Sequence, residues 1–94
     1  MVKIQFTPSY AKMLEVLLKN HPNLRNSIDT SEARFRDNPR DTRLRTHALR
    51  KKLHGKYAFS VNGDIRIVFE WSGKTTARFL AIGSHKKVYG RIKE

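Results

Sequence analysis

Apolar and polar residues alternate through residues 57–71, on both sides of Asn62-Gly63. A period of two is typical of half-buried β-strands, and Asn-Gly between two such runs favours a hairpin with a two-residue turn. The pattern therefore predicts a β-hairpin. A second turn at 71–74 leads into residues 75–82, whose composition favours a third strand.

The turn decides which residues of the hairpin share a face of the sheet. A two-residue turn places Phe59 opposite Arg66, and paired residues point to the same side. A longer turn or a bulge would exchange the sides for one strand. The face expected to meet the helices carries Ala58, Ser60, Ile65, Ile67 and Phe69. The other face carries Tyr57, Phe59, Asp64, Arg66, Val68 and Glu70.

An arginine beside aromatic rings on an open face suits phosphates and stacked bases. An ordinary amphipathic sheet with Arg66 turned to solvent is the simpler interpretation of the same pattern.

The N-terminal part predicts one strand and two helices. Residues 2–7 alternate as in a half-buried strand, and Pro8-Ser9 then opens a helix with Ser9 as its N-cap. A second helix ends before Asn38-Pro39, because proline disfavours helical geometry in the residue before it. Apolar stripes mark the buried faces, with Tyr10, Met13, Leu14, Leu17 and Leu18 in the first helix and Leu24, Ile28 and Phe35 in the second.

Residues 40–56 are basic, with Leu44, Leu49 and Leu53 as the large apolar residues, and fit a loop, a short strand or a helix. The element order is then β-α-α-β-β-β. An antiparallel sheet with both helices on one face would bury both stripes. We predict an α+β fold, a small antiparallel sheet with the two N-terminal helices packed on one face, in a single domain of residues 1–94.

Positive charge dominates the composition. The chain contains 20 Lys and Arg against 8 Asp and Glu, a formal net charge of +12. Residues 34–56 hold nine of the basic residues and two acids, a net charge of +7. Such density attracts polyphosphate, anionic lipid or an acidic protein, and we favour nucleic acid because no amphipathic membrane helix accompanies it. A solvated basic surface is the simpler interpretation.

The chain has no cysteine, which excludes disulfides and thiolate metal sites and is compatible with a reducing cytoplasm. No segment approaches the ~18 apolar residues of a membrane span, and no secretory leader is apparent. We therefore expect a cytoplasmic protein.

Four histidines are candidates for proton transfer near neutral pH. His21 lies in a helix-breaking turn and is expected at the surface, whereas His47, His54 and His85 lie in or beside the basic part of the chain and the sheet. His85 follows the last strand and is expected to project from the sheet edge. Their spacing fits no zinc signature, and nucleophile-elbow, P-loop and dinucleotide motifs are absent. We expect no metal or cofactor, and from composition alone each is more simply a surface histidine.

Three segments resemble the RelE/ParE toxin superfamily. Residues 46–55 contain a His-x-Leu and a Leu-x-Gly element, residues 57–69 contain Arg-Ile-Val-Phe, and residues 82–89 read Ile-Gly-x-His-x-x-Val-Tyr. The branch with the greatest similarity is that of the YafQ-type ribosome-dependent mRNA endonucleases. The resemblance covers about half of the chain closely.

The resemblance implies roles for individual residues. It places His47, Asp64 and His85 at catalytic positions of the YafQ-type site, and Arg66 at the strand arginine that RelE-type toxins use on the scissile phosphate. Ser60 departs from the pattern, because the YafQ branch has a second active-site histidine there. Either His54 or a nearby lysine substitutes for it, or fewer groups carry the reaction, or activity is weak. The substrate-binding residues that we expect are Tyr89, His54, Lys51, Lys52, Arg43, Arg45, Lys86 and Lys87.

The function implied is that of a type II toxin that cuts mRNA in the ribosomal decoding site without a metal and so inhibits translation. Its partners would be a cognate antitoxin, in a toxin–antitoxin hetero-oligomer, and the ribosome with its rRNA and mRNA. Two alternatives stay open. One is a ParE-like toxin that binds a protein such as gyrase, against which the segment with His85 argues. The other is a non-catalytic ribosome- or RNA-binding module, which the serine at position 60 favours.

Overall fold

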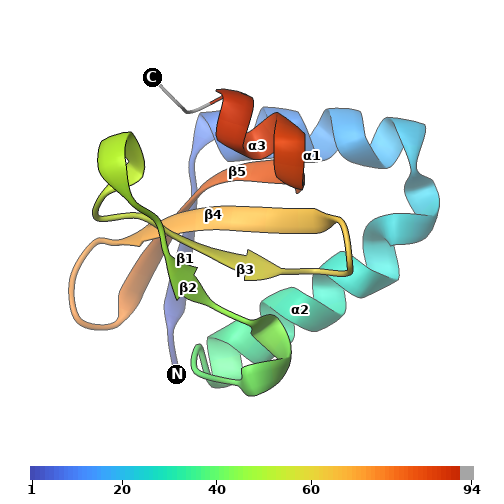
Figure 1. Ribbon diagram of the computed structural model, residues 1–94. Coiled ribbons are helices and arrows are strands. Elements are labelled where there is room, and N and C mark those ends of the chain that lie inside the picture. The colour runs from blue at the N-terminus through green and yellow to red at the C-terminus, as the bar shows by residue number, and fades with distance from the viewer. Residues whose placement is uncertain (92–94) are drawn as a thin grey trace.

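The computed structural model describes residues 1–91, with side chains through Val88, and contains a five-stranded sheet in the order β1-β5-β4-β3-β2 (Figure 1). The strands are β1 (Lys3–Phe6), β2 (His47–Ala48), β3 (Tyr57–Ser60), β4 (Ile65–Trp71) and β5 (Thr76–Ser84). The helices are α1 (Pro8–Asn20), α2 (Arg25–Asp37) and α3 (His85–Arg91), with short 3-10 turns η1 (Pro22–Leu24), η2 (Thr42–Leu44) and η3 (Lys51–Leu53). Within residues 1–91, no helix has the length and apolar character needed to cross a bilayer.

The sheet is mixed, which corrects the prediction of an antiparallel one. β1 pairs with β5 in parallel, with Lys3 opposite Thr76, whereas all other neighbouring strands are antiparallel. The chain passes from β1 through both helices to the far edge and returns strand by strand, so its first and last strands become neighbours. Alternation shows that a segment is a strand, but not its partner or direction. The two-residue strand β2 lies in residues 40–56, for which a short strand was one of three alternatives, and the helix α3 was not predicted.

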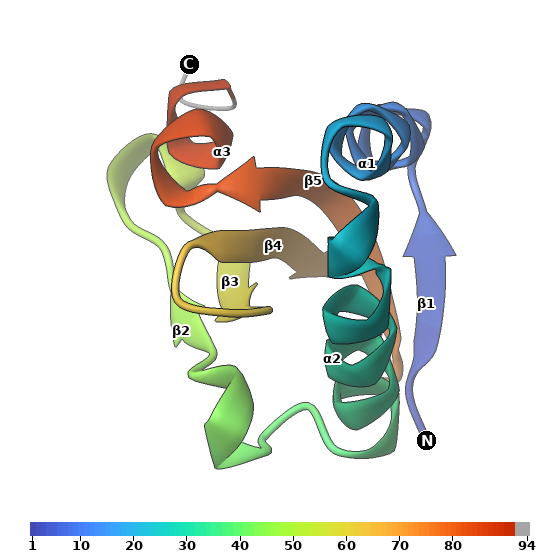
Figure 2. The same cartoon turned by 90° about the vertical axis from the view of Figure 1, so that its right-hand side faces the viewer.

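Both N-terminal helices pack on one face of the sheet, as predicted, and α3 lies on the opposite face (Figure 2). The N-cap of α1 lies two residues earlier than expected: the Thr7 hydroxyl accepts the N–H of Tyr10 at 3.1 Å, so Thr7 rather than Ser9 is the N-cap. α2 ends at Asp37, directly before Asn38-Pro39, as predicted.

An aromatic core joins the helices to the sheet. The Phe35 ring of α2 is fully buried, and its centroid lies 4.9 Å from that of Phe59, 4.8 Å from Phe69 and 5.4 Å from Phe79. Tyr10 of α1 meets Phe79 edge-on at 5.4 Å. Rings at these distances and angles stabilise the fold by more than the burial of their apolar area. This core therefore holds the strands against the helices.

The turn between β3 and β4 is longer than the Asn-Gly pair predicts. The Val61 N–H donates to the Ile65 carbonyl at 2.9 Å, so residues 62–64 form the connection. The Asn62 Oδ1 accepts the backbone N–H groups of Asp64 and Ile65, both at 2.8 Å. Asparagine can thus organise a turn through its side chain instead of through a left-handed backbone.

The longer turn shifts the register and makes the predicted face wrong for β3. Ser60 lies opposite Arg66, and Phe59 lies opposite Ile67 on the side that faces α2. Tyr57, opposite Phe69, is on the helix side too, while Ala58, opposite Val68, shares the side of Arg66. The prediction is right for β4: Arg66, Val68 and Glu70 face away from α1 and α2. We call this side the Arg66 face.

α3 packs on the Arg66 face. The Ser84 hydroxyl accepts the N–H of Lys87 at 3.2 Å, and Val88 is fully buried. A Cβ on Gly83 would lie 3.5 Å from Val88 Cγ1, which is an ordinary van der Waals contact, so the strand and α3 leave space for a side chain as small as alanine here. His85 is exposed as expected, but it begins this helix instead of projecting from a sheet edge.

Candidate active site

The Arg66 face combines a small apolar patch with polar residues. Ala58, Val68 and Ala81 lie in one row across three strands and are fully buried. His47 of β2 extends this row at the sheet edge, opposite Ala58. The next row, two residues along, is Ser60, Arg66 and Gly83. The side chains beside Arg66 in these rows are thus small or polar.

Arg66 is half-buried and reaches toward the turn that precedes β4. Its NH1 donates to the carbonyl of Asn62 at 3.0 Å and to that of Ile65 at 3.4 Å. These bonds hold one arm of the guanidinium close to the 62–64 turn. The planar fork of arginine can grip two oxygens of a phosphate, so its position on this face suits an anionic ligand.

The turn also brings Asp64 and His85 together, although they are far apart in sequence. The backbone N–H of His85 donates to the carbonyl of Asp64 at 3.0 Å. This bond ties the start of α3 to the turn that holds Arg66. Three of the four residues predicted to be catalytic, Asp64, Arg66 and His85, therefore gather at one end of the β3–β4 hairpin.

His47 occupies a different part of the same face. It lies on β2, two strands from β4, and two strand spacings amount to about 10 Å. Its Nδ1 lies 3.1 Å from the carbonyl oxygen of Arg45. Because a carbonyl only accepts, Nδ1 must carry the proton, and Nε2 is the basic nitrogen of the neutral ring. The arrangement suits His47 to accept a proton at Nε2.

The predicted substrate-binding residues fall into separate groups. Lys51, Lys52 and His54 belong to the loop between β2 and β3, which lies on the same side of the sheet as α3 (Figure 2). Lys86 and Lys87 are exposed in the first turn of α3. Arg43 and Arg45 lie at η2, beyond the other end of β2. The side chain of Tyr89 lies outside the described residues.

Arg43 is held by Asp41 in a two-pronged pair. Its Nε and NH2 donate to the two carboxylate oxygens at 3.0 and 2.7 Å. The hydrogen bonds from Arg43 lower the pKa of Asp41 to about 2, so the carboxylate is ionised at neutral pH. The charge count of the segment includes Asp41 but did not reveal that it pairs with Arg43.

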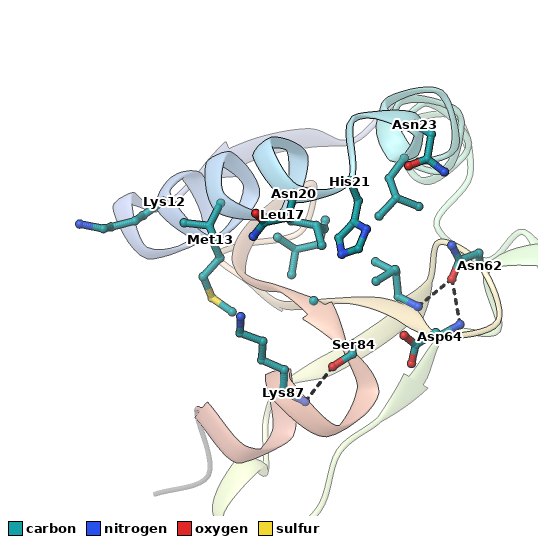
Figure 3. A pocket seen from close by; sticks show the side chains of 15 residues that line it. Lys12, Met13, Leu17, Asn20, His21, Asn23, Asn62, Asp64, Ser84 and Lys87 are labelled. Atoms are coloured by element: carbon teal, nitrogen blue, oxygen red, sulfur yellow. Dashed lines mark hydrogen bonds between the residues drawn. The ribbon is translucent and has the colours of Figure 1, made fainter.

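A groove of about 510 Å³ adjoins this site on the helix side (Figure 3). Asn20 and His21 reach it from the end of α1, Asp64 from the turn, and Ser84 and Lys87 from the start of α3. The sequence identified His21 only as a surface residue. No local pattern could place it in one groove with Asp64, because the packing of α1 beside β5 brings the two segments to the same groove.

The side chains within residues 1–91 include no group of three or more His, Asp or Glu residues arranged to hold a metal ion. The groups that the candidate site offers are arginine, histidine, carboxylate and lysine side chains.

No protein-family model matches the chain, and no curated protein matches it. Solved structures do share its fold. YafQ from E. coli strain BL21(DE3) has a TM-score of 0.80 at 18% sequence identity, covering 96% of this chain and 100% of that chain. YafQ in the E. coli DinJ–YafQ complex gives a TM-score of 0.78 at 18% identity, over 96% of this chain and 100% of that chain.

Two further structures extend the comparison. A YoeB/ParE toxin from Agrobacterium tumefaciens has a TM-score of 0.75 at 15% identity, over 89% of this chain and 99% of that chain. The YoeB–YefM complex from Staphylococcus aureus has a TM-score of 0.71 at 16% sequence identity, over 90% of this chain and 98% of that chain. The chain thus has the fold of the RelE/ParE-type toxins, and the expected resemblance is confirmed at the level of the fold.

Proposed function

We propose that this chain is the toxin of a type II toxin–antitoxin system and that it cleaves mRNA on the ribosome. The observation that supports this most is the gathering of Arg66, Asp64 and His85 at one end of the β3–β4 hairpin, with His47 on the Arg66 face. A basic exterior with a net charge of +12 suits a protein that works against rRNA and mRNA.

The proposed reaction is attack of an RNA 2′-hydroxyl on its own 3′-phosphate. The oxygen–phosphorus bond forms, the bond to the 5′-oxygen breaks, and a 2′,3′-cyclic phosphate and a 5′-hydroxyl result. The step needs a base for the 2′-hydroxyl, positive charge on the phosphorane and an acid for the leaving oxygen. No metal has to take part.

We assign these roles by position. Arg66 stabilises the charge on the phosphate oxygens, and His47 accepts the proton at Nε2 in its neutral form. His85 gives a proton to the leaving oxygen, and Asp64 orients His85 or the substrate. Ser60 lies opposite Arg66, where it can donate a hydrogen bond but cannot serve as a base near neutral pH. The lysines at 51, 52, 86 and 87 would contact RNA phosphates.

The proposed partners are a cognate antitoxin and the ribosome. The E. coli YafQ and S. aureus YoeB structures of the same fold are complexes with DinJ and YefM, and the latter is described as a toxin–antitoxin heterotetramer. A basic toxin surface would attract an acidic antitoxin segment, and the same charge would make ribosome binding fall steeply with salt.

Primer extension on a translated message tests the function. We expect new 5′ ends in a translation reaction that contains the protein, and none when the same message is incubated with the protein but without ribosomes. Inhibited translation without new ends would favour a non-catalytic ribosome-binding module. Unaffected translation, with inhibition of gyrase, would favour the ParE-like alternative.

A further inference from the structure

A second groove, of about 850 Å³, lies at the other end of the sheet and has aromatic rings among its lining residues. Tyr57 is half-buried, with its ring stacked on Phe69 at 5.5 Å and 24°. Trp71 is 36% exposed and stacks on the fully buried Phe35 at 6.0 Å and 23°. The core thus holds one side of each ring in place, and both residues line the groove. We call it the aromatic groove.

Cations surround these rings. Arg40, Arg45 and Lys74 line the aromatic groove, and all three are exposed. Asp41 is the one carboxylate among the lining residues, and Arg43 binds both of its oxygens. The groove is therefore positive at neutral pH. Flat rings flanked by cations are the arrangement with which proteins hold unpaired bases and their phosphates.

The aromatic groove is continuous with the proposed catalytic face. His47 lies on the Arg66 face by strand register, yet it also lines the groove, because β2 is a two-residue edge strand. A single strand that crosses this edge would pass from the catalytic face into the groove. An acidic protein segment could bind the cations, but its carboxylate side chains could not stack on the fixed rings as a base can.

We propose that the aromatic groove binds an unpaired base of a single-stranded RNA against Trp71 and Tyr57, with neighbouring phosphates on Arg40, Arg45 and Lys74. The RNA ligand rests on the proposed function, and among the residues that line the groove only His47 has a role in the proposed cleavage. A base held here would fix the position of the strand relative to His47. The groove would then contribute to the choice of the cleavage site.

Trp71 is the single tryptophan of the chain and reports directly on this groove. We would titrate the intact protein with 2′-O-methyl hexa-adenylate, which cannot undergo attack by a 2′-hydroxyl, and follow tryptophan fluorescence. Stacking of a base on the indole should quench the fluorescence in a saturable manner. The double variant Arg45→Ala, Lys74→Ala, whose side chains lie outside the core, should weaken the binding by roughly ten-fold, as expected for the loss of phosphate contacts.

The matched control is Lys19→Ala, Arg25→Ala, which removes the same charge from exposed positions at the junction of α1 and α2. We expect it to bind nearly as the wild type does. Equal weakening by both double variants, or binding of a labelled oligonucleotide with unchanged Trp71 fluorescence, would overturn the proposal. Equal quenching by poly-glutamate would assign the groove to an acidic peptide instead.

Cleavage is measured separately, so the two proposals can fail independently. A protein that cleaves translated message but shows no quenching would refute the groove alone. A protein whose Trp71 is quenched by the oligonucleotide, but which cuts no message, would refute the catalytic proposal alone.

Discussion

The two faces of the central hairpin differ in what they bury. On the helix side, Phe59, Ile67 and Phe69 are almost fully buried beneath α2 and form one continuous aromatic core with it. On the other side, burial is limited to small residues, and Ser60 and Arg66 remain partly accessible. The hairpin thus separates the residues that hold the fold from those that are available to a ligand. Substitutions on the helix side should act on stability, and substitutions on the Arg66 face on activity.

The largest effect is expected for Phe35→Ala. Phe35 is fully buried and stacks on Phe59, so removal of the ring leaves a cavity in the aromatic core. We expect a loss of about 3–5 kcal/mol in the free energy of unfolding, measured by urea denaturation. Phe6→Ala, at a ring that is 49% exposed, is the control and should cost clearly less. Equal losses for the two variants would show that the core is not where we place it.

His85→Ala should instead affect activity. The backbone bond between His85 and Asp64 survives this substitution, so the start of α3 should stay in place. We expect single-turnover cleavage on the ribosome to fall by roughly a hundred-fold. His21→Ala is the control, and a wild-type rate for His85→Ala would remove His85 from the mechanism.

Ser60→His is expected to increase activity, whereas His85→Ala is expected to reduce it. Ser60 lies opposite Arg66, so an imidazole there would point to the same side as the guanidinium. A further titrating group beside the phosphate should raise the cleavage rate, by roughly ten-fold if it shares the work of general acid–base catalysis. Single-turnover rates of Ser60→His and of Ser60→Asn, which adds a polar group without titration, test this. Equal rates would mean that the position does not contact the reacting groups.

Tyr10→Phe should have the smallest effect. The Tyr10 hydroxyl is buried and has no hydrogen-bond partner within residues 1–91, and burial raises its pKa. Removal of an unsatisfied buried hydroxyl should leave stability unchanged or increase it by about 1 kcal/mol. The raised pKa also means that the wild type loses stability as the pH rises above about 10, where the unfolded tyrosine ionises.

Urea denaturation of both proteins at neutral and alkaline pH measures this difference. The phenylalanine variant should lack the alkaline loss that Tyr10 causes. A variant that is less stable at neutral pH would indicate that the hydroxyl has a partner in solution.

The sequence was sufficient for the α+β class, for both N-terminal helices and for the side of the sheet on which Arg66 lies. Periodicity determines such features locally. The sequence was not sufficient for the register of β3. The side chain of Asn62 organises a three-residue turn between β3 and β4, where the Asn-Gly pair had predicted a two-residue turn. The parallel pairing of β1 with β5 and the contact of His85 with Asp64 depend on packing between distant segments, which no local pattern contains.

The sequence predicted which residues belong to the candidate site, but not where they lie relative to one another. The resemblance of short motifs selected His47, Asp64, Arg66 and His85 without indicating their relative positions. The structure gathers three of them at one end of the hairpin and leaves His47 at the sheet edge, where a ring nitrogen meets the carbonyl of Arg45. The aromatic groove was not predicted, because its rings and cations come from three separate segments.

The most direct test is the single-turnover cleavage rate of Arg66→Ala on ribosome-bound message, with the melting temperature of the same preparation. The control is Arg78→Ala, an arginine on the same face that is paired with Glu70 at 2.7 Å. We predict that Arg66→Ala melts close to the wild type and cleaves roughly ten- to a thousand-fold more slowly, as expected when a charge-stabilising donor is lost. The Arg78 variant should retain most of the activity. A wild-type cleavage rate for Arg66→Ala, or a protein that no longer folds, would contradict the division between the two faces.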